Sequence, residues 1–176
     1  MQLPNPPESL ALAFYNGLEH GRLLDRIIAR HDRGRSAGPY SHVELVFNPH
    51  RGGVPVCFSS SWRDGGVRFK RIDLSEAGRW SLVPLAVTGA DVVAVRSWCL
   101  RHVGGRYDVP GVLAFKLPLV RHRLNWWFCS EICVAALQEV GLLPLVKAHR
   151  TTPNALHHLL AATRATPLAA THADEG

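Results

Sequence analysis

The chain of 176 residues has no apolar run approaching the roughly 18 uncharged residues that would suggest a membrane-spanning helix. Its first ten residues, MQLPNPPESL, lack the basic segment and the long apolar stretch of a signal peptide. We therefore expect a cytoplasmic protein with no transmembrane segment, whose contact with a membrane could only be peripheral. Delivery outside the cell would need a lysis or phage system.

Charged residues are also few, at 19%, whereas apolar residues make up 47% of the chain. This composition excludes a largely disordered protein and is typical of a globular one. No internal repeat divides the chain, so we expect a single domain over residues 1–162. The remaining residues, 163–176, are rich in Ala and Thr and end in acidic residues, and we expect this tail to be disordered.

Close cysteine pairs with the spacing of a zinc site are missing. The four cysteines lie at 57, 99, 129 and 133, and Cys129 and Cys133 are separated by three residues with no second close pair. A structural zinc site is therefore not expected. Because the chain is neither short nor visibly secreted, we interpret all four as free thiols. No cofactor is required.

The chain is basic, with 20 Lys and Arg against 14 Asp and Glu. A basic surface can attract nucleic acid, anionic lipid or an acidic cell-wall polymer, and the net charge does not choose among them. The nearest approach to a basic cluster is interrupted by glycine and apolar residues; it comprises Arg63, Arg68, Lys70 and Arg71. We interpret it as a solvated basic face, and no specific nucleic-acid partner is expected. The sequence leaves the oligomeric state open.

Hydrophobic periodicity and turn residues predict alternating strands and helices. The predicted strands cover residues 8–16, 40–47, 54–61, 67–74 and 81–87, and the predicted helices cover 21–31, 88–102, 126–144 and 152–162. Three of these strands follow one another with short turns and should form an antiparallel meander. Thr88 is the expected N-cap of one helix, and Thr152 with Pro153 opens the last. Within 126–144, the helix should end at Gly141 as its C-cap, with Pro144 beyond it.

Two residues could form a nucleophile and its base. Cys129 falls at or just before the first turn of its helix, where unpaired N–H groups and the helix dipole favour a thiolate. His42 is embedded in the strand YSHVELVF and could supply an imidazolium to the same thiolate. Each also has a simpler interpretation, because Cys129 shares an apolar helix face with Cys133 and a histidine near a strand end can be structural.

A third residue would orient the histidine. Glu44 lies two positions from His42, hence on the same strand face, and its carboxylate could fix the imidazole tautomer. The neighbouring strand offers an alternative in Ser59, Ser60 and Ser61, with Asp64 just beyond. Glu44 is the first choice.

The order of motifs resembles the circularly permuted NlpC/P60 group of papain-like cysteine peptidases and amidases. An early strand His in YSHVELVF precedes GGRYD, the helix opening FCSEICVAAL and the segment TTPNAL, so that the likeness spans roughly residues 8–160. The resemblance implies an α+β papain-like fold, with an antiparallel sheet packed against the helix of Cys129. It also implies acyl transfer through Cys129 and His42, with an oxyanion held by backbone N–H groups of Cys129 and Ser130, and Tyr107 in the pocket.

The substrate is left open between an amide, such as a peptidoglycan-like cell-wall peptide, and an acyl ester of a lipid. Trp62, in SSSWRDGG, could contact a substrate or pack in the core. H-x-E at His42 followed by two cysteines faintly resembles zinc nucleobase deaminases, but the required P-C-x-x-C is absent. A papain-like scaffold serving as a binding or assembly module is the non-enzymatic alternative.

Overall fold

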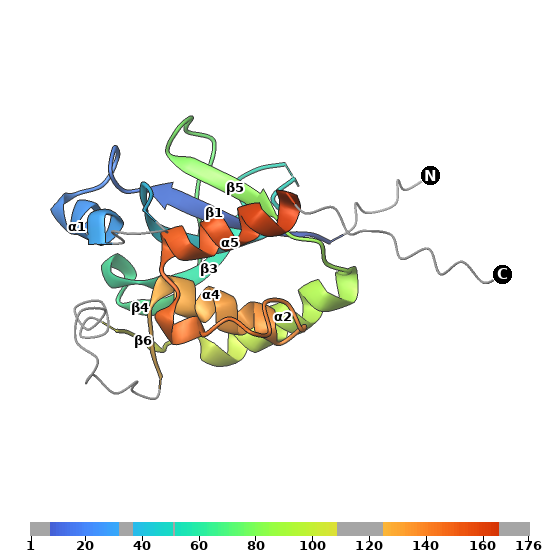
Figure 1. Ribbon diagram of the computed structural model, residues 1–176. Helices are drawn as coiled ribbons and strands as arrows, with labels where there is room; N and C mark the ends of the chain where they lie inside the picture. The colour runs from blue at the N-terminus through green and yellow to red at the C-terminus, as the bar shows by residue number, and fades with distance from the viewer. Residues whose placement is uncertain (1–7, 32–36, 51, 109–124, 166–176) are drawn as a thin grey trace.

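The computed structural model describes residues 8–31, 37–50, 52–108 and 125–165 (Figure 1). Strands and helices both contribute to it, which confirms the α+β class. The strands are β1 (Leu10–Asn16), β2 (Tyr40–Phe47), β3 (Val56–Ser61), β4 (Gly66–Arg71), β5 (Trp80–Pro84), β6 (Arg106–Tyr107) and β7 (Trp126–Trp127). The α-helices are α1 (Leu23–His31), α2 (Gly89–His102), α4 (Cys129–Gln138) and α5 (Pro153–Ala165), and short 3-10 turns are η1 (Trp62–Asp64) and η2 (Ala148–Arg150).

The seven strands form one sheet in the order β5-β1-β2-β3-β4-β6-β7. All neighbouring pairs are antiparallel except β6 with β7, which is parallel. The predicted meander corresponds to β2, β3 and β4. Gly66 lets β4 approach β6, because its φ is 144° and a Cβ at this position would lie 2.1 Å from the carbonyl oxygen of Gly105. This close approach places β6, which carries Tyr107, in the sheet between β4 and β7.

One face of the sheet is covered by helices. Figure 1 shows α4 beside α2, and α4 contacts β2 and β3 while α5 contacts β2. Every apolar residue of α4 that faces the sheet is buried, including Ile132 and Leu137, and these pack on Val43, Leu45 and other strand residues. Burial of each such side chain stabilises the fold by about 1.5–3 kcal/mol. The helix that begins at Cys129 is thus held firmly on the sheet.

The opposite strand face is lined by small residues. Ala11, Ala13, Val46 and Cys57 form a second buried cluster there. Because side chains alternate along a strand, Glu44 shares this face with Val46 rather than the helix-covered face of Val43. A polar region can therefore form on this side of β2 without disturbing the main core.

The helix predicted over 126–144 is wrong at both ends. Trp126 and Trp127 pair with β6 as strand β7, and α4 begins only at Cys129. The helix ends at Gln138, and Gly141 is not its C-cap, although its φ of 74° is left-handed. The Gln138 side chain donates to the carbonyls of residues 143 and 146, at 3.0 and 2.8 Å, which holds the chain as it turns back.

Two predicted helix starts are confirmed. Thr88 accepts a hydrogen bond from the Asp91 backbone N–H at 3.2 Å, and Thr152 accepts one from the backbone N–H of Ala155 at 3.1 Å. Helix α5 runs to Ala165, three residues into the predicted tail, and the rest of that tail lies outside the described residues. Most of the connector after Tyr107 also lies outside them. Within the described ranges, no helix has the length and apolar character to cross a membrane.

Candidate active site

Cys129 is the first residue of α4. The turn that it opens is closed by Glu131, whose carboxylate accepts a hydrogen bond from the backbone N–H of Phe128 at 3.2 Å. The first N–H groups of any α-helix have no partner within the helix, and the helix dipole adds a partial positive charge at the same point. The Cys129 sulfur therefore lies where negative charge is favoured.

His42 lies on β2, whose start is fixed by Asn154 of α5. The Asn154 side chain accepts a hydrogen bond from the Tyr40 backbone N–H at 2.9 Å and donates to the carbonyl of Ala29 at 3.4 Å. Asn154 is 1% exposed, and it joins α5, α1 and β2. This explains why a segment far along the chain, TTPNAL, matters to the position of a histidine near its beginning.

The structure brings His42 and Cys129 close enough for Cys129 to raise the pKa of His42. Burial lowers the pKa of His42, but the hydrogen bond to Cys129 and the negative charge of its thiolate, aided by Glu44, raise it to about 10. The raised pKa favours the imidazolium form of His42. Cys129 is fully buried, which agrees with a purely structural role in the core. The neighbouring ionisable His42 is not explained by such a role, because packing in an apolar core requires no charged partner.

Glu44 completes a row of three side chains. Its Oε1 lies 2.7 Å from Nε2 of His42, which leaves Nδ1 as the ring nitrogen available to the Cys129 thiol. Burial raises the pKa of Glu44, but hydrogen bonds and charge from His42 and Arg68 outweigh it and lower the pKa below its ordinary value. A carboxylate in this position orients the imidazole and stabilises its protonated form.

Arg68, on β4, holds Glu44 from the other side. Its Nη1 donates to Oε2 of Glu44 at 2.8 Å and its Nη2 donates to Oε1 at 2.6 Å, a bidentate pair in which Glu44 is 1% exposed. The Arg68 Nε donates to Asp64 at 2.7 Å, and Lys70 donates to the same carboxylate at 2.7 Å. The charges of Glu44 and Asp64 are therefore neutralised by protein cations.

The alternative orienting residues occupy other positions. Ser59 donates to the carbonyl of Val43 at 2.7 Å, and Asp64 binds Arg68 and Lys70. Neither is hydrogen-bonded to His42 in the described part of the chain. The choice of Glu44 over the residues of β3 and η1 therefore agrees with the geometry.

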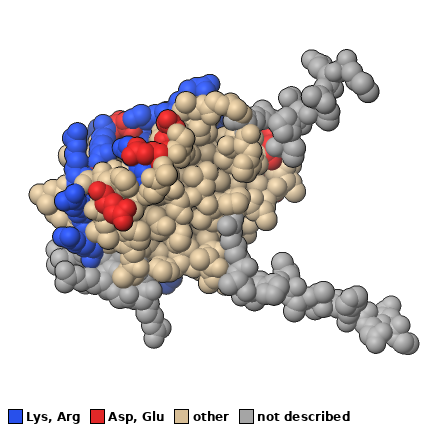
Figure 2. Space-filling model, turned by 90° about the horizontal axis from the view of Figure 1, so that it is seen from above, with Lys and Arg blue, Asp and Glu red and all other residues tan. Residues whose placement is uncertain are grey.

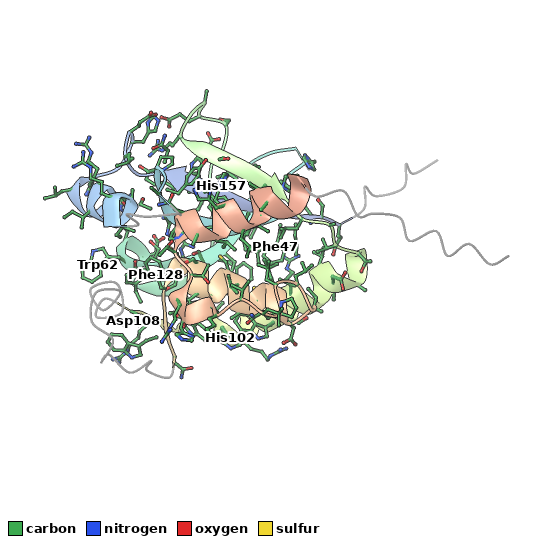
Figure 3. The ribbon with its side chains drawn as sticks, in the orientation of Figure 1. Phe47, Trp62, His102, Asp108, Phe128 and His157 are labelled. Atoms are coloured by element: carbon green, nitrogen blue, oxygen red, sulfur yellow. The ribbon has the colours of Figure 1, made fainter. Side chains whose placement is uncertain are left out.

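Three aromatic residues lie close together near this site, and two of them, Trp62 and Tyr107, line a cleft beside it. Tyr107 stands between Trp62 and Phe128, with ring centroids 6.4 and 6.0 Å away, and Figure 3 labels Trp62 and Phe128 at the same end of the molecule. Trp62 is 55% exposed, so core packing does not account for it. Burial and then the negative charge of Cys129 raise the pKa of Tyr107, which places Tyr107 near the sulfur as an uncharged hydroxyl.

Ser130 plays a structural part with its side chain. Its hydroxyl is fully buried and donates to the carbonyl of Thr151, which ties α4 to the segment before α5. Only its backbone N–H is then left for an oxyanion.

A cleft of about 500 Å³ opens beside these residues. His42, Glu44, Trp62 and Tyr107 line it together with side chains of α1, β4 and the β5 region. In Figure 2, Lys and Arg side chains gather toward one side of the molecule with acidic side chains among them. A substrate in the cleft would thus meet both aromatic and charged groups.

Sequence reasoning did not assign a role to Arg68. The alternation of Val67 and Phe69 with Arg68 and Lys70 already put the two cations on one face of a strand, opposite the apolar residues. The pattern could not show that β4 lies two strands away from β2, nor that Arg68 and Glu44 project from the same face of the sheet. That pairing depends on the register of β3, in which Ser59 stands opposite Arg68.

Comparisons of the chain with protein-family models, with curated proteins and with solved structures found no match. Among the residues that the structure describes, no three His, Cys, Asp or Glu side chains are grouped so that they could hold a metal ion. The ligand set that a zinc deaminase would need is therefore not assembled around His42 in this region.

Proposed function

We propose that this protein is a cysteine-nucleophile hydrolase of the circularly permuted NlpC/P60, papain-like type. The observation that carries the proposal is the position of His42, whose Nε2 lies 2.7 Å from Oε1 of Glu44 and whose pKa is raised by the neighbouring Cys129. The order along the chain, with the histidine strand before the cysteine helix, supports the permuted arrangement. Acyl transfer by a cysteine usually requires a nucleophile within reach of a base, and a third group that orients the base.

The reaction proceeds by two acyl transfers. The Cys129 thiolate attacks the acyl carbon, a C–S bond forms, and the bond to the leaving amine or alcohol breaks as His42 donates its proton to that group. His42 then takes a proton from water, whose oxygen attacks the thioester and releases a carboxylic acid and the thiolate. No redox change occurs in either step, and Glu44 keeps the imidazole oriented throughout.

Backbone N–H groups at the start of α4 would stabilise the oxyanion of each tetrahedral intermediate. Those of Cys129 and Ser130 are in the first turn, where the helix itself provides no acceptor. We assign substrate contact to Tyr107 and Trp62, because both line the cleft that contains His42.

Amide bonds, as in cell-wall peptides, are the first substrate class that we propose, followed by acyl esters of lipids. A second candidate function is a binding module on the same scaffold, and the complete burial of Cys129 favours it. The two candidates differ in whether the sulfur can be acylated.

The test is to incubate the protein with para-nitrophenyl butyrate and with a peptide amide library, quench in acid and search for a thioester by peptide mass spectrometry. We expect an acyl group on Cys129 alone, with release of one equivalent of nitrophenolate before steady hydrolysis. Boiled protein and the Cys129→Ala variant are the controls. An acyl group on none of the four cysteines would leave the binding module as the better proposal.

A further inference from the structure

The cleft beside His42 has an unusual charge balance. Six of its lining residues are Arg or Lys and four are Asp or Glu; the cations are Arg22, Arg63, Arg68, Lys70, Arg71 and Arg79. They come from the segment before α1, from η1, from β4 and from the segment before β5. The cations therefore surround the same space into which the proposed catalytic histidine faces.

Most of these cations already have a carboxylate. Arg68 and Lys70 bind Glu44 and Asp64, and Arg63 binds Asp25. Arg79 binds Glu76, which does not line the cleft. These ion pairs neutralise three of the four carboxylates of the cleft wall. The fourth, Asp73, accepts a hydrogen bond from the backbone N–H of Ser75 at 2.9 Å and has no ion pair among the described residues.

Two arginines remain without a carboxylate among the described residues. The guanidinium of Arg71 donates to the carbonyl of Val54 at 3.1 Å, a neutral acceptor. For Arg22, only the backbone N–H is bonded, to Asp25 at 2.9 Å, and its guanidinium has no hydrogen bond or ion pair in the described part of the chain. Two exposed guanidinium groups thus belong to residues that line the cleft, against one lining carboxylate, Asp73, that is not in an ion pair.

We propose that Arg22 and Arg71 bind an anionic group, a carboxylate or a phosphate, on the substrate whose acyl carbon reaches Cys129. The inference rests on the proposed function and narrows its substrate class to acyl compounds that carry a negative charge. A guanidinium binds either anion through two parallel N–H donors, which gives direction as well as attraction. Residual positive charge in a cleft also concentrates anionic substrates there.

The test compares para-nitrophenyl butyrate with the mono-para-nitrophenyl ester of succinate, which has the same chain length and a terminal carboxylate in place of a methyl group. A third ester, of phosphonopropionate, separates phosphate from carboxylate recognition. We expect kcat/KM to be at least about tenfold higher for one anionic ester than for the butyrate, and the advantage to fall as salt screens the charges.

The double variant Arg22→Gln, Arg71→Gln should abolish the preference while its rate with the butyrate ester stays within about twofold. Arg101→Gln is the matched control, since Arg101 lies on α2, is 59% exposed and does not line the cleft. It should keep the preference.

Equal kcat/KM for all three esters at an acylated Cys129 would overturn this inference and leave the proposed function standing. A preference that survives in the double variant would also overturn it, because other cations would then be responsible. If no ester acylates Cys129, the proposed function fails and this inference fails with it.

Discussion

Cys129 and Cys133 lie one turn apart on the same face of α4, and both are completely buried. Their surroundings differ. Cys133 contacts the backbone carbonyls of Val43 and Phe58, at 3.9 and 4.0 Å, and burial raises its pKa well above the ordinary value, so that it stays a neutral thiol. Cys129 is bonded to His42 at the helix start.

The comparison shows that burial alone does not decide the chemistry of a cysteine. The two thiols are equally shielded from water, but only one has a cation and a helix N-terminus beside it. Cys57 and Cys99 resemble Cys133: burial raises the pKa of both, that of Cys57 to about 12. Reactivity should therefore follow the neighbours of each thiol, which can be tested by changing them in turn.

The largest expected effect is on hydrolysis when either cysteine of α4 is replaced. Cys129→Ala should lower para-nitrophenyl ester hydrolysis to the background rate, because the proposed nucleophile is removed. Cys133→Ala should keep activity within a few fold and cost about 1 kcal/mol of stability, since it leaves a small core cavity. Burst kinetics and urea unfolding measure the two properties; comparable loss of activity in both variants would contradict the comparison.

The next effect comes from the base. His42→Ala should lower hydrolysis by about 10²–10⁴, the usual contribution of a general base. It should also slow iodoacetamide alkylation of Cys129 at pH 6, where the imidazolium supports the thiolate, and leave Cys133 unchanged. Cysteine-resolved mass spectrometry over time measures both sites in one sample. His50→Ala, at an exposed position, is the control; unchanged alkylation in His42→Ala would disprove the ion pair.

Glu44→Gln tests the support behind the histidine. The substitution keeps the shape of the side chain but removes its charge. The Arg68 guanidinium, which is only 16% exposed, then has Asp64 as its remaining carboxylate partner. Breaking a buried ion pair by removing one partner should destabilise the protein by about 2–4 kcal/mol. By contrast, Glu139→Gln breaks a surface pair with Arg101 and should cost less than about 0.5 kcal/mol. Urea midpoints of the two variants give the difference, and equal losses would contradict it.

The smallest effect is a pH dependence of that difference. The folded state lowers the pKa of Glu44 below its ordinary value of 4.5. The stability that this provides is complete above pH 4.5 and is lost as pH falls through the lowered value. The gap in urea midpoint between wild type and Glu44→Gln should therefore be largest between the ordinary pKa values of Glu44 and His42, 4.5 and 6.5, and shrink below pH 4.5. A gap that stays constant down to pH 3 would show that charge is not what Glu44 contributes.

Three elements show which parts of the secondary structure can be predicted from the sequence pattern. The strand at 40–47 has the predicted bounds because alternating β-branched and aromatic residues run from one turn to the next. The capping box at Thr88 and Asp91 is a local interaction and was equally readable. Trp126 and Trp127 were misassigned, because they are strand only by pairing with β6, and that partner lies some twenty residues earlier in the chain.

The sequence by itself determined the α+β class, the meander and the location of Cys129 at a helix start, because each depends on neighbours within one or two turns of chain. It also put Glu44 and His42 on one strand face, since strand alternation has a period of two. Tertiary structure alone decided that Cys129 meets His42, which is 87 positions away, and that Arg68 reaches Glu44 from another strand. Such contacts depend on sheet register and helix packing, and neither is encoded in the spacing of residues along one element.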